Sequence, residues 1–207
     1  MRFSLLFVFL LASAWAQDYK VETTSAPPAG LPPAYASSMQ AQGYRVVGPN
    51  GPWCEIWFRT SIPQGAKPTD DAIMFPIPQG ALVGILRFPS EGSDRRGQTI
   101  KAGVYTMRYS DFPVDGAHQG VAPQRDFLLL TPIASDADPS ATPAFDKLVQ
   151  MSTKASGTPH PAVFSIERPA ASNFPSMTTE GDTPDQVLNV KIGDFQLAMI
   201  VVGKAQN

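Results

Sequence analysis

The chain has few of the residues that most enzymes use for chemistry. Its 207 residues include one cysteine and two histidines, and only 16% are charged, against the roughly 25% usual for soluble domains. A single cysteine excludes an internal disulfide. Two histidines far apart, His118 and His160, do not provide the closely spaced ligands of a zinc site. The low charge also excludes a long disordered acidic or basic protein.

Several motifs with a known mechanism are missing as well. The sequence contains no glycine-rich phosphate loop, no G-x-S-x-G serine elbow and no H-E-x-x-H metal motif. It has no basic run beyond Arg95-Arg96, and its net charge is −2, whereas a nucleic-acid partner requires a clustered positive face. We therefore expect no metal, no cofactor and no nucleic-acid partner.

The N-terminus has the layout of a secretory signal peptide. Met1-Arg2 gives a positive start, residues 3–11 are almost all apolar, and Ala14-Trp15-Ala16 places small residues before Gln17. This predicts a signal peptide over 1–16, cleavage near Ala16-Gln17 and a secreted or periplasmic protein. The apolar run is shorter than the roughly 20 residues of a membrane span, so no span is expected in the mature chain. A retained anchor helix is the alternative.

The next segment, 17–42, is rich in proline. Pro27-Pro28 and Pro32-Pro33 fix an extended backbone and supply no amide donors. This composition predicts an extended spacer, followed by a single domain over 43–207.

From residue 43 onward the hydrophobic period becomes two, which is typical of strands. Cys54, Ile56 and Phe58 alternate with polar neighbours, and Gly193-Asp194 joins the last two strands as a tight hairpin. About eight short strands bounded by turns predict a mainly β fold, an antiparallel β-sandwich or flattened barrel. The predicted strands cover 44–47, 54–59, 81–88, 103–109, 126–130, 162–167, 187–192 and 195–202.

One helix is expected near 143–155. Thr142 could cap it, Leu148 and Ser152 follow helical spacing, and Gly157 marks its end. The strands do not alternate with helices, which excludes a doubly wound nucleotide-binding sheet.

The connection over 110–125 is the main candidate site. A strand-to-strand connection of about 16 residues is longer than a hairpin needs, and such loops are often functional. Its polar groups could bind an anionic or sugar-like ligand, or act as acid and base. The alternative is an ordered loop in which Arg125 pairs with Asp111 or Asp115. The candidate ligand-binding residues are Asp111, Asp115, His118, Gln119, Arg125 and, if the fold brings it close, His160.

Three further features have a functional and a structural interpretation. Trp53 and Trp57 could form a carbohydrate-stacking face or pack in the core. Cys54, among aromatic residues, is best interpreted as a buried small hydrophobe. Asp136 and Asp138 could contribute to a calcium site, although the spacing is not that of an EF-hand.

Residues 100–107 (Ile-Lys-Ala-Gly-Val-Tyr-Thr-Met) and 126–130 (Asp-Phe-Leu-Leu-Leu) resemble a group of small exported bacterial β-sandwich proteins of unknown function. These share a P-A-G-x-Y-[ST]-L strand entry, where this chain has Lys101-Ala102. The resemblance implies a sandwich and a bacterial extracytoplasmic setting, and it implies no activity.

The combined expectation is an exported, soluble and non-enzymatic module. It would bind a small ligand, a glycan or an envelope protein through the 110–125 loop. The alternative is a hydrolase or isomerase that uses His118 with Asp111 or Asp115 as acid and base. A structural envelope protein is the third option.

Overall fold

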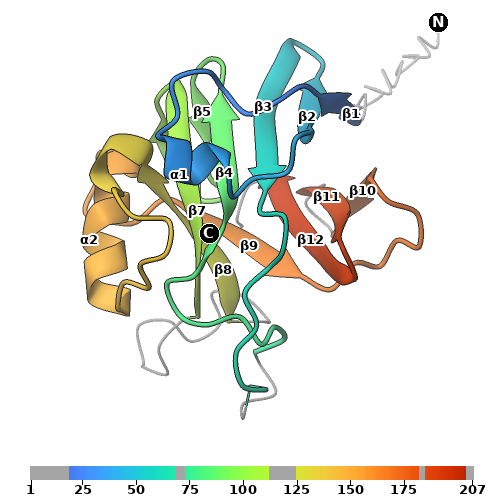
Figure 1. Cartoon of the computed structure of the whole chain (residues 1–207). Helices are drawn as coiled ribbons and strands as arrows, with labels where there is room; N and C mark the ends of the chain where they lie inside the picture. The colour runs from blue at the N-terminus through green and yellow to red at the C-terminus, as the bar shows by residue number, and fades with distance from the viewer. Residues whose placement is uncertain (1–18, 69–72, 112–124, 182–184, 204–207) are drawn as a thin grey trace, which may run out of the picture.

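The computed structural model describes residues 19–68, 73–111, 125–181 and 185–203. Ten antiparallel strands form one sheet, nearly closed into a barrel, in the order β1-β2-β3-β4-β7-β8-β9-β12-β11-β10 (Figure 1). The predicted mainly β fold is confirmed. The strands are β1 Lys20–Thr24, β2 Gly43–Gly48, β3 Gly51–Phe58, β4 Leu82–Phe88, β7 Gly103–Asp111, β8 Asp126–Pro132, β9 Val163–Glu167, β10 Ser176–Glu180, β11 Asp185–Ile192 and β12 Phe195–Val202, with a separate pair, β5 Gly92–Ser93 and β6 Thr99–Ile100.

The registers place three connections at the same end of the barrel. Leu82 at the start of β4 pairs with Arg108 near the end of β7, and Asp111 pairs with Asp126. Farther around the sheet, the end of β9 pairs with the first half of β12. The β3–β4, β7–β8 and β11–β12 connections therefore all emerge at one rim, which we call the loop end.

The barrel interior is filled by the apolar face of each strand. Tyr105, Met107 and Tyr109 of β7 point inward, as their spacing predicts. The predicted inward face of β3 is confirmed too, because Cys54, Ile56 and Phe58 are all fully buried in the same cluster. The structure adds four strands to the predicted eight, β1, β5, β6 and β10.

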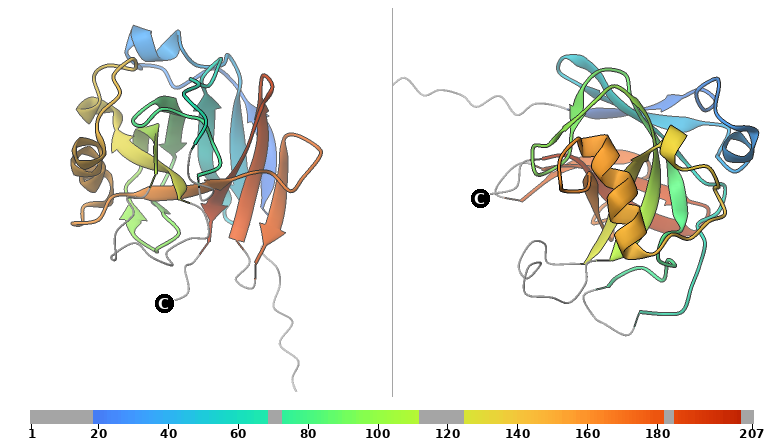
Figure 2. Two further views of the ribbon diagram at one scale, coloured as in Figure 1. Left: turned by 90° about the horizontal axis from the view of Figure 1, so that it is seen from below. Right: turned by 90° about the vertical axis from the view of Figure 1, so that its left-hand side faces the viewer.

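The long connection between β3 and β4 runs across the loop end of the barrel (Figure 2, left view). It places Ile62, Phe75 and Ile77 in the central cluster, each less than 8% exposed. These three residues of the connection are therefore part of the hydrophobic core.

The predicted helix is confirmed as α2, Phe145–Ser156. Leu148 packs with Phe127 and Leu129 on the outer face of β8. The expected cap by Thr142 is wrong, because the N-cap residue is Ala144 and no side chain caps the helix. Gly157 ends the helix in a left-handed conformation, φ 66°, which glycine adopts without steric cost.

The segment that precedes residue 43 differs from the spacer that its prolines predict. β1 pairs with β2 along its whole length, and Pro33–Ala36 form the short helix α1. Residues 25–39, which we call the N-terminal strap, lie over the outer face of β3 and β4 (Figure 1). Tyr35 is fully buried there against Trp57. Apolar burial overrides the extended preference of the prolines, and Pro33 fits the first turn of a helix.

No helix in the described part of the chain is long and apolar enough to cross a membrane.

Candidate functional site

The two ends of the predicted site loop are joined by an ion pair. Nη2 of Arg125 donates to Oδ2 of Asp111 at 3.0 Å, and their side chains are 19% and 30% exposed. The sequence allowed this pairing as the alternative to a ligand site. Asp115, His118 and Gln119 lie outside the described residues, so their role stays a prediction. The ion pair joins the end of β7 to the residue that precedes β8, next to the paired residues Asp111 and Asp126.

His160 lies at the other end of the barrel. It precedes β9, whose first residue Val163 pairs with Leu129, whereas Arg125 precedes the opposite end of β8. The His160 side chain is exposed, and its backbone makes the contacts with Ser156 and Thr158. His160 and Arg125 therefore do not converge on one site.

Asp126, next to the ion pair, binds the backbone of the β3–β4 connection. Its carboxylate accepts hydrogen bonds from the backbone N–H groups of Met74 at 2.7 Å and Phe75 at 3.1 Å. The Tyr109 hydroxyl donates to it at 2.8 Å. Burial raises the pKa of Asp126, although these three hydrogen bonds oppose the shift. The residue acts as a structural carboxylate, as its place at the start of an apolar strand predicts.

The Tyr109 phenol is suited to this role. Burial raises its pKa, and the neighbouring Asp126 carboxylate raises it further. The hydroxyl therefore stays protonated and remains a donor at physiological pH. Together these bonds fix the β3–β4 connection against β7 and β8.

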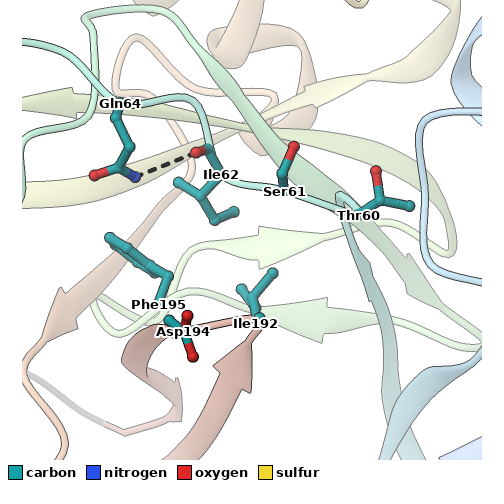
Figure 3. A pocket seen from close by; sticks show the side chains of 8 residues that line it. Thr60, Ser61, Ile62, Gln64, Ile192, Asp194 and Phe195 are labelled. Carbon is teal, nitrogen blue, oxygen red and sulfur yellow. Dashed lines mark hydrogen bonds between the residues drawn. The ribbon is translucent and has the colours of Figure 1, made fainter.

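A pocket of about 390 Å³ opens at the loop end, between the β3–β4 connection and the β11–β12 hairpin (Figure 3). Its apolar part includes the Phe195 ring, which also contacts the ring of Phe75 with centroids 5.4 Å apart. The hydrogen bonds that the Met74 and Phe75 N–H groups donate to Asp126 therefore hold Phe75 in place against the Phe195 ring, which lines the pocket. The lining residues are Thr60, Ser61, Ile62, Gln64, Ile192, Gly193, Asp194 and Phe195.

Sequence reasoning missed this pocket. It joins two connections more than 120 positions apart, and neither carries a motif. The only signal in the sequence is the Gly193-Asp194 turn followed by Phe195, an aromatic residue at the beginning of a strand.

Sequence reasoning also missed a buried polar cluster around Arg108, on the side of the barrel. Arg108 of β7 is fully buried under the segment that contains Asp136. Its guanidinium donates to both carboxylate oxygens of Asp136, at 2.6 and 2.8 Å, and to backbone carbonyls of Gly80, Asp138 and Ala141. Asp136 is thus engaged by protein donors. The Asp138 carboxylate accepts two bonds from Ser140, so these residues do not form the calcium site that their spacing allowed.

The tryptophans and the cysteine are structural. Trp57 is 2% exposed, and its Nε1 donates to the Ser25 carbonyl of the N-terminal strap at 2.8 Å. Trp53 donates to the carbonyl of Val201 and packs edge-on against Phe88. The pKa of Cys54 is raised by burial and by the adjacent Glu55, so this thiol is not activated. The interpretation of Cys54 as a buried hydrophobe is confirmed.

Among the described residues, no three His, Cys, Asp or Glu side chains lie close enough to hold a metal ion. Comparison of the chain with protein families, with curated proteins and with solved structures finds no significant match.

Proposed function

We propose that the protein is an exported, non-enzymatic binding module that holds a small ligand, glycan or envelope protein at the loop end of its barrel. The 110–125 loop contributes His118, Asp115 and Gln119, and the flanking Asp111 and Arg125 anchor it.

The observation that carries this proposal is the support beneath the loop. The Asp111–Arg125 pair, at 3.0 Å, lies directly beside Asp126, which ties β7, β8 and the β3–β4 connection together. A rigid sheet that presents a variable polar connection is the usual arrangement of binding loops. The pocket beside Phe195 opens at the same rim as the Asp111–Arg125 pair, which supports a binding surface at this end of the barrel.

The test is a screen of the full chain against a glycan array and a library of small metabolites, followed by variants. His118→Ala and Arg125→Ala should each weaken binding of a hit at least tenfold, with a melting temperature close to that of the wild type. His160→Ala is the matched control, because His160 is exposed at the opposite end, and it should leave binding unchanged.

The proposal is wrong if both loop variants bind each hit as the wild type does. It is also wrong if both variants melt several degrees lower, since the loop would then serve the fold.

A further inference from the structure

The pocket at the loop end combines an apolar wall with a polar rim that holds one charged residue, Asp194. Figure 3 shows Ile62 and Ile192 pointing toward one another, with the Phe195 ring beside them. Ser61 and Gln64 lie on the same β3–β4 connection as Ile62, across the pocket from Ile192 and Phe195, and the Ser61 hydroxyl points away from the Phe195 ring in this view. A volume of about 390 Å³ lies within the range of roughly 300–1,000 Å³ typical of small-molecule sites.

The polar groups of the rim are mostly unused by the protein. Nε2 of Gln64 donates to the Ile62 carbonyl at 3.2 Å. Its Oε1, and the hydroxyls of Thr60 and Ser61, have no hydrogen-bond partner within the residues that the structure describes. Together with the Asp194 carboxylate, the rim is rich in acceptors and offers only hydroxyls as donors. A ligand with several hydroxyl donors matches this set.

The charge of the pocket argues against ionic ligands. No Lys, Arg or His lines it, so it lacks the donors that bind phosphate or carboxylate groups. Its one charged residue, Asp194, is fully exposed and lies 3.8 Å from the Lys191 ammonium group. This neighbour partly offsets the carboxylate charge that would otherwise attract a cation.

We propose that this pocket binds a neutral saccharide, with an apolar face of one sugar ring on Phe195 and its hydroxyls on the Gln64 rim. Aromatic side chains supply a large apolar contact area, and the surrounding acceptors satisfy the hydroxyls. The inference rests on the proposed binding function, and it names the ligand class and the residues that recognise it.

The test is a titration of the full chain with neutral disaccharides, monitored by NMR chemical shifts or calorimetry. The three sugars are cellobiose, maltose and N,N′-diacetylchitobiose. At least one should bind saturably. Phe195→Ala should weaken that binding at least tenfold, and Gln64→Ala about threefold to tenfold through the loss of one hydrogen bond. His160→Ala is the matched control and should leave the affinity unchanged, because His160 is exposed at the opposite end of the barrel.

Because Phe195 also packs on Phe75, its replacement could disturb the fold. Ser61→Trp provides the second variant: it adds a bulky group from an exposed position of the rim, and it should block binding while the far-ultraviolet spectrum and melting temperature stay unchanged.

The inference fails if none of the three sugars binds, or if a bound sugar is unaffected by both Phe195→Ala and Ser61→Trp. It also fails if methylammonium competes with the sugar and Asp194→Asn abolishes binding, since the pocket would then be a cation site. These outcomes differ from failure of the proposed function, because His118→Ala and Arg125→Ala report on the loop alone. A ligand lost in the loop variants but kept in the pocket variants would preserve the module and reject the sugar site.

Discussion

Two arginine–aspartate pairs contact the same strand, β7, and they differ in almost every physical respect. Arg108 and Asp136 are 0% and 3% exposed, whereas Arg125 and Asp111 are 19% and 30% exposed. In the buried pair, two hydrogen bonds join guanidinium and carboxylate. The partly exposed pair is joined by one hydrogen bond between Nη2 of Arg125 and Oδ2 of Asp111, at 3.0 Å.

The difference lies in what surrounds each guanidinium. Three backbone carbonyls, from Gly80, Asp138 and Ala141, accept the remaining donors of Arg108. Thr106 adds a bond to Asp136. The buried pair therefore joins β7, the end of the β3–β4 connection and the segment after β8 in one place. A satisfied network of this kind fixes one arrangement of the backbone, whereas an exposed pair can separate at small cost.

The largest effect is expected when the buried cation is removed. Arg108→Ala should lower the free energy of unfolding by about 3–5 kcal/mol, since it leaves the Asp136 carboxylate and three carbonyls without their donor in a dry site. Equilibrium urea unfolding of the full chain measures this loss.

The double variant Arg108→Met with Asp136→Leu is the control. Replacing both charges by apolar side chains should recover part of the lost stability, because it removes the unpaired Asp136 carboxylate. The carbonyls of Gly80, Asp138 and Ala141 would still lack their donor. If Arg108→Ala lowers the free energy of unfolding by less than about 1 kcal/mol, the buried network does not hold the backbone in one arrangement.

Asp126 provides an intermediate case, a buried carboxylate that accepts three hydrogen bonds and has no cationic partner among the described residues. Asp126→Asn should lower stability by about 1–3 kcal/mol, because the N–H groups of Met74 and Phe75 bond different oxygens of Asp126, and the substitution replaces one of these acceptors by an NH2 donor. The pKa of Asp126 is raised by burial, so its favourable contribution is full below the ordinary Asp value of 3.8 and falls as pH rises through the raised value.

The deficit of Asp126→Asn should therefore be larger at pH 4 than at pH 7. Urea unfolding of both proteins at the two pH values measures it, with His160→Ala as an exposed control. A deficit that grows toward neutral pH would mean that the hydrogen bonds, and not burial, dominate the carboxyl group.

The fold was largely predictable because each strand is buried on a defined face. β7 shows this well, since the alternation of Tyr105, Met107 and Tyr109 fixes its inward side. β1 was not predictable, because Lys20–Thr24 carries only one apolar residue and adjoins prolines. The position of the N-terminal strap was not predictable either, because its burial depends on Trp57 and Ile85, which are distant in sequence.

The candidate site was predictable only in part. The local pairing of Asp111 with Arg125 follows from the β7–β8 connection, whose two ends must lie side by side. The Phe195 pocket and the Arg108 network involve segments that only the closed sheet brings together. Periodicity reports which face of a strand is buried, and it carries no information about which distant connection covers that face.

The smallest effect is expected at the exposed pair. Asp111→Asn removes the charge opposite Arg125, and it should cost less than about 1 kcal/mol of stability, because solvent screens the pair. The difference from wild type should shrink further at high salt. Urea unfolding at low and high salt measures both effects, with Asp194→Asn as a control for an exposed carboxylate. A loss of more than about 2 kcal/mol that persists at high salt would place the Asp111–Arg125 pair in the same class as Arg108–Asp136. The base of the 110–125 loop would then be a part of the folded core that tolerates no adjustment, and a binding role for Arg125 could not be separated from a structural one.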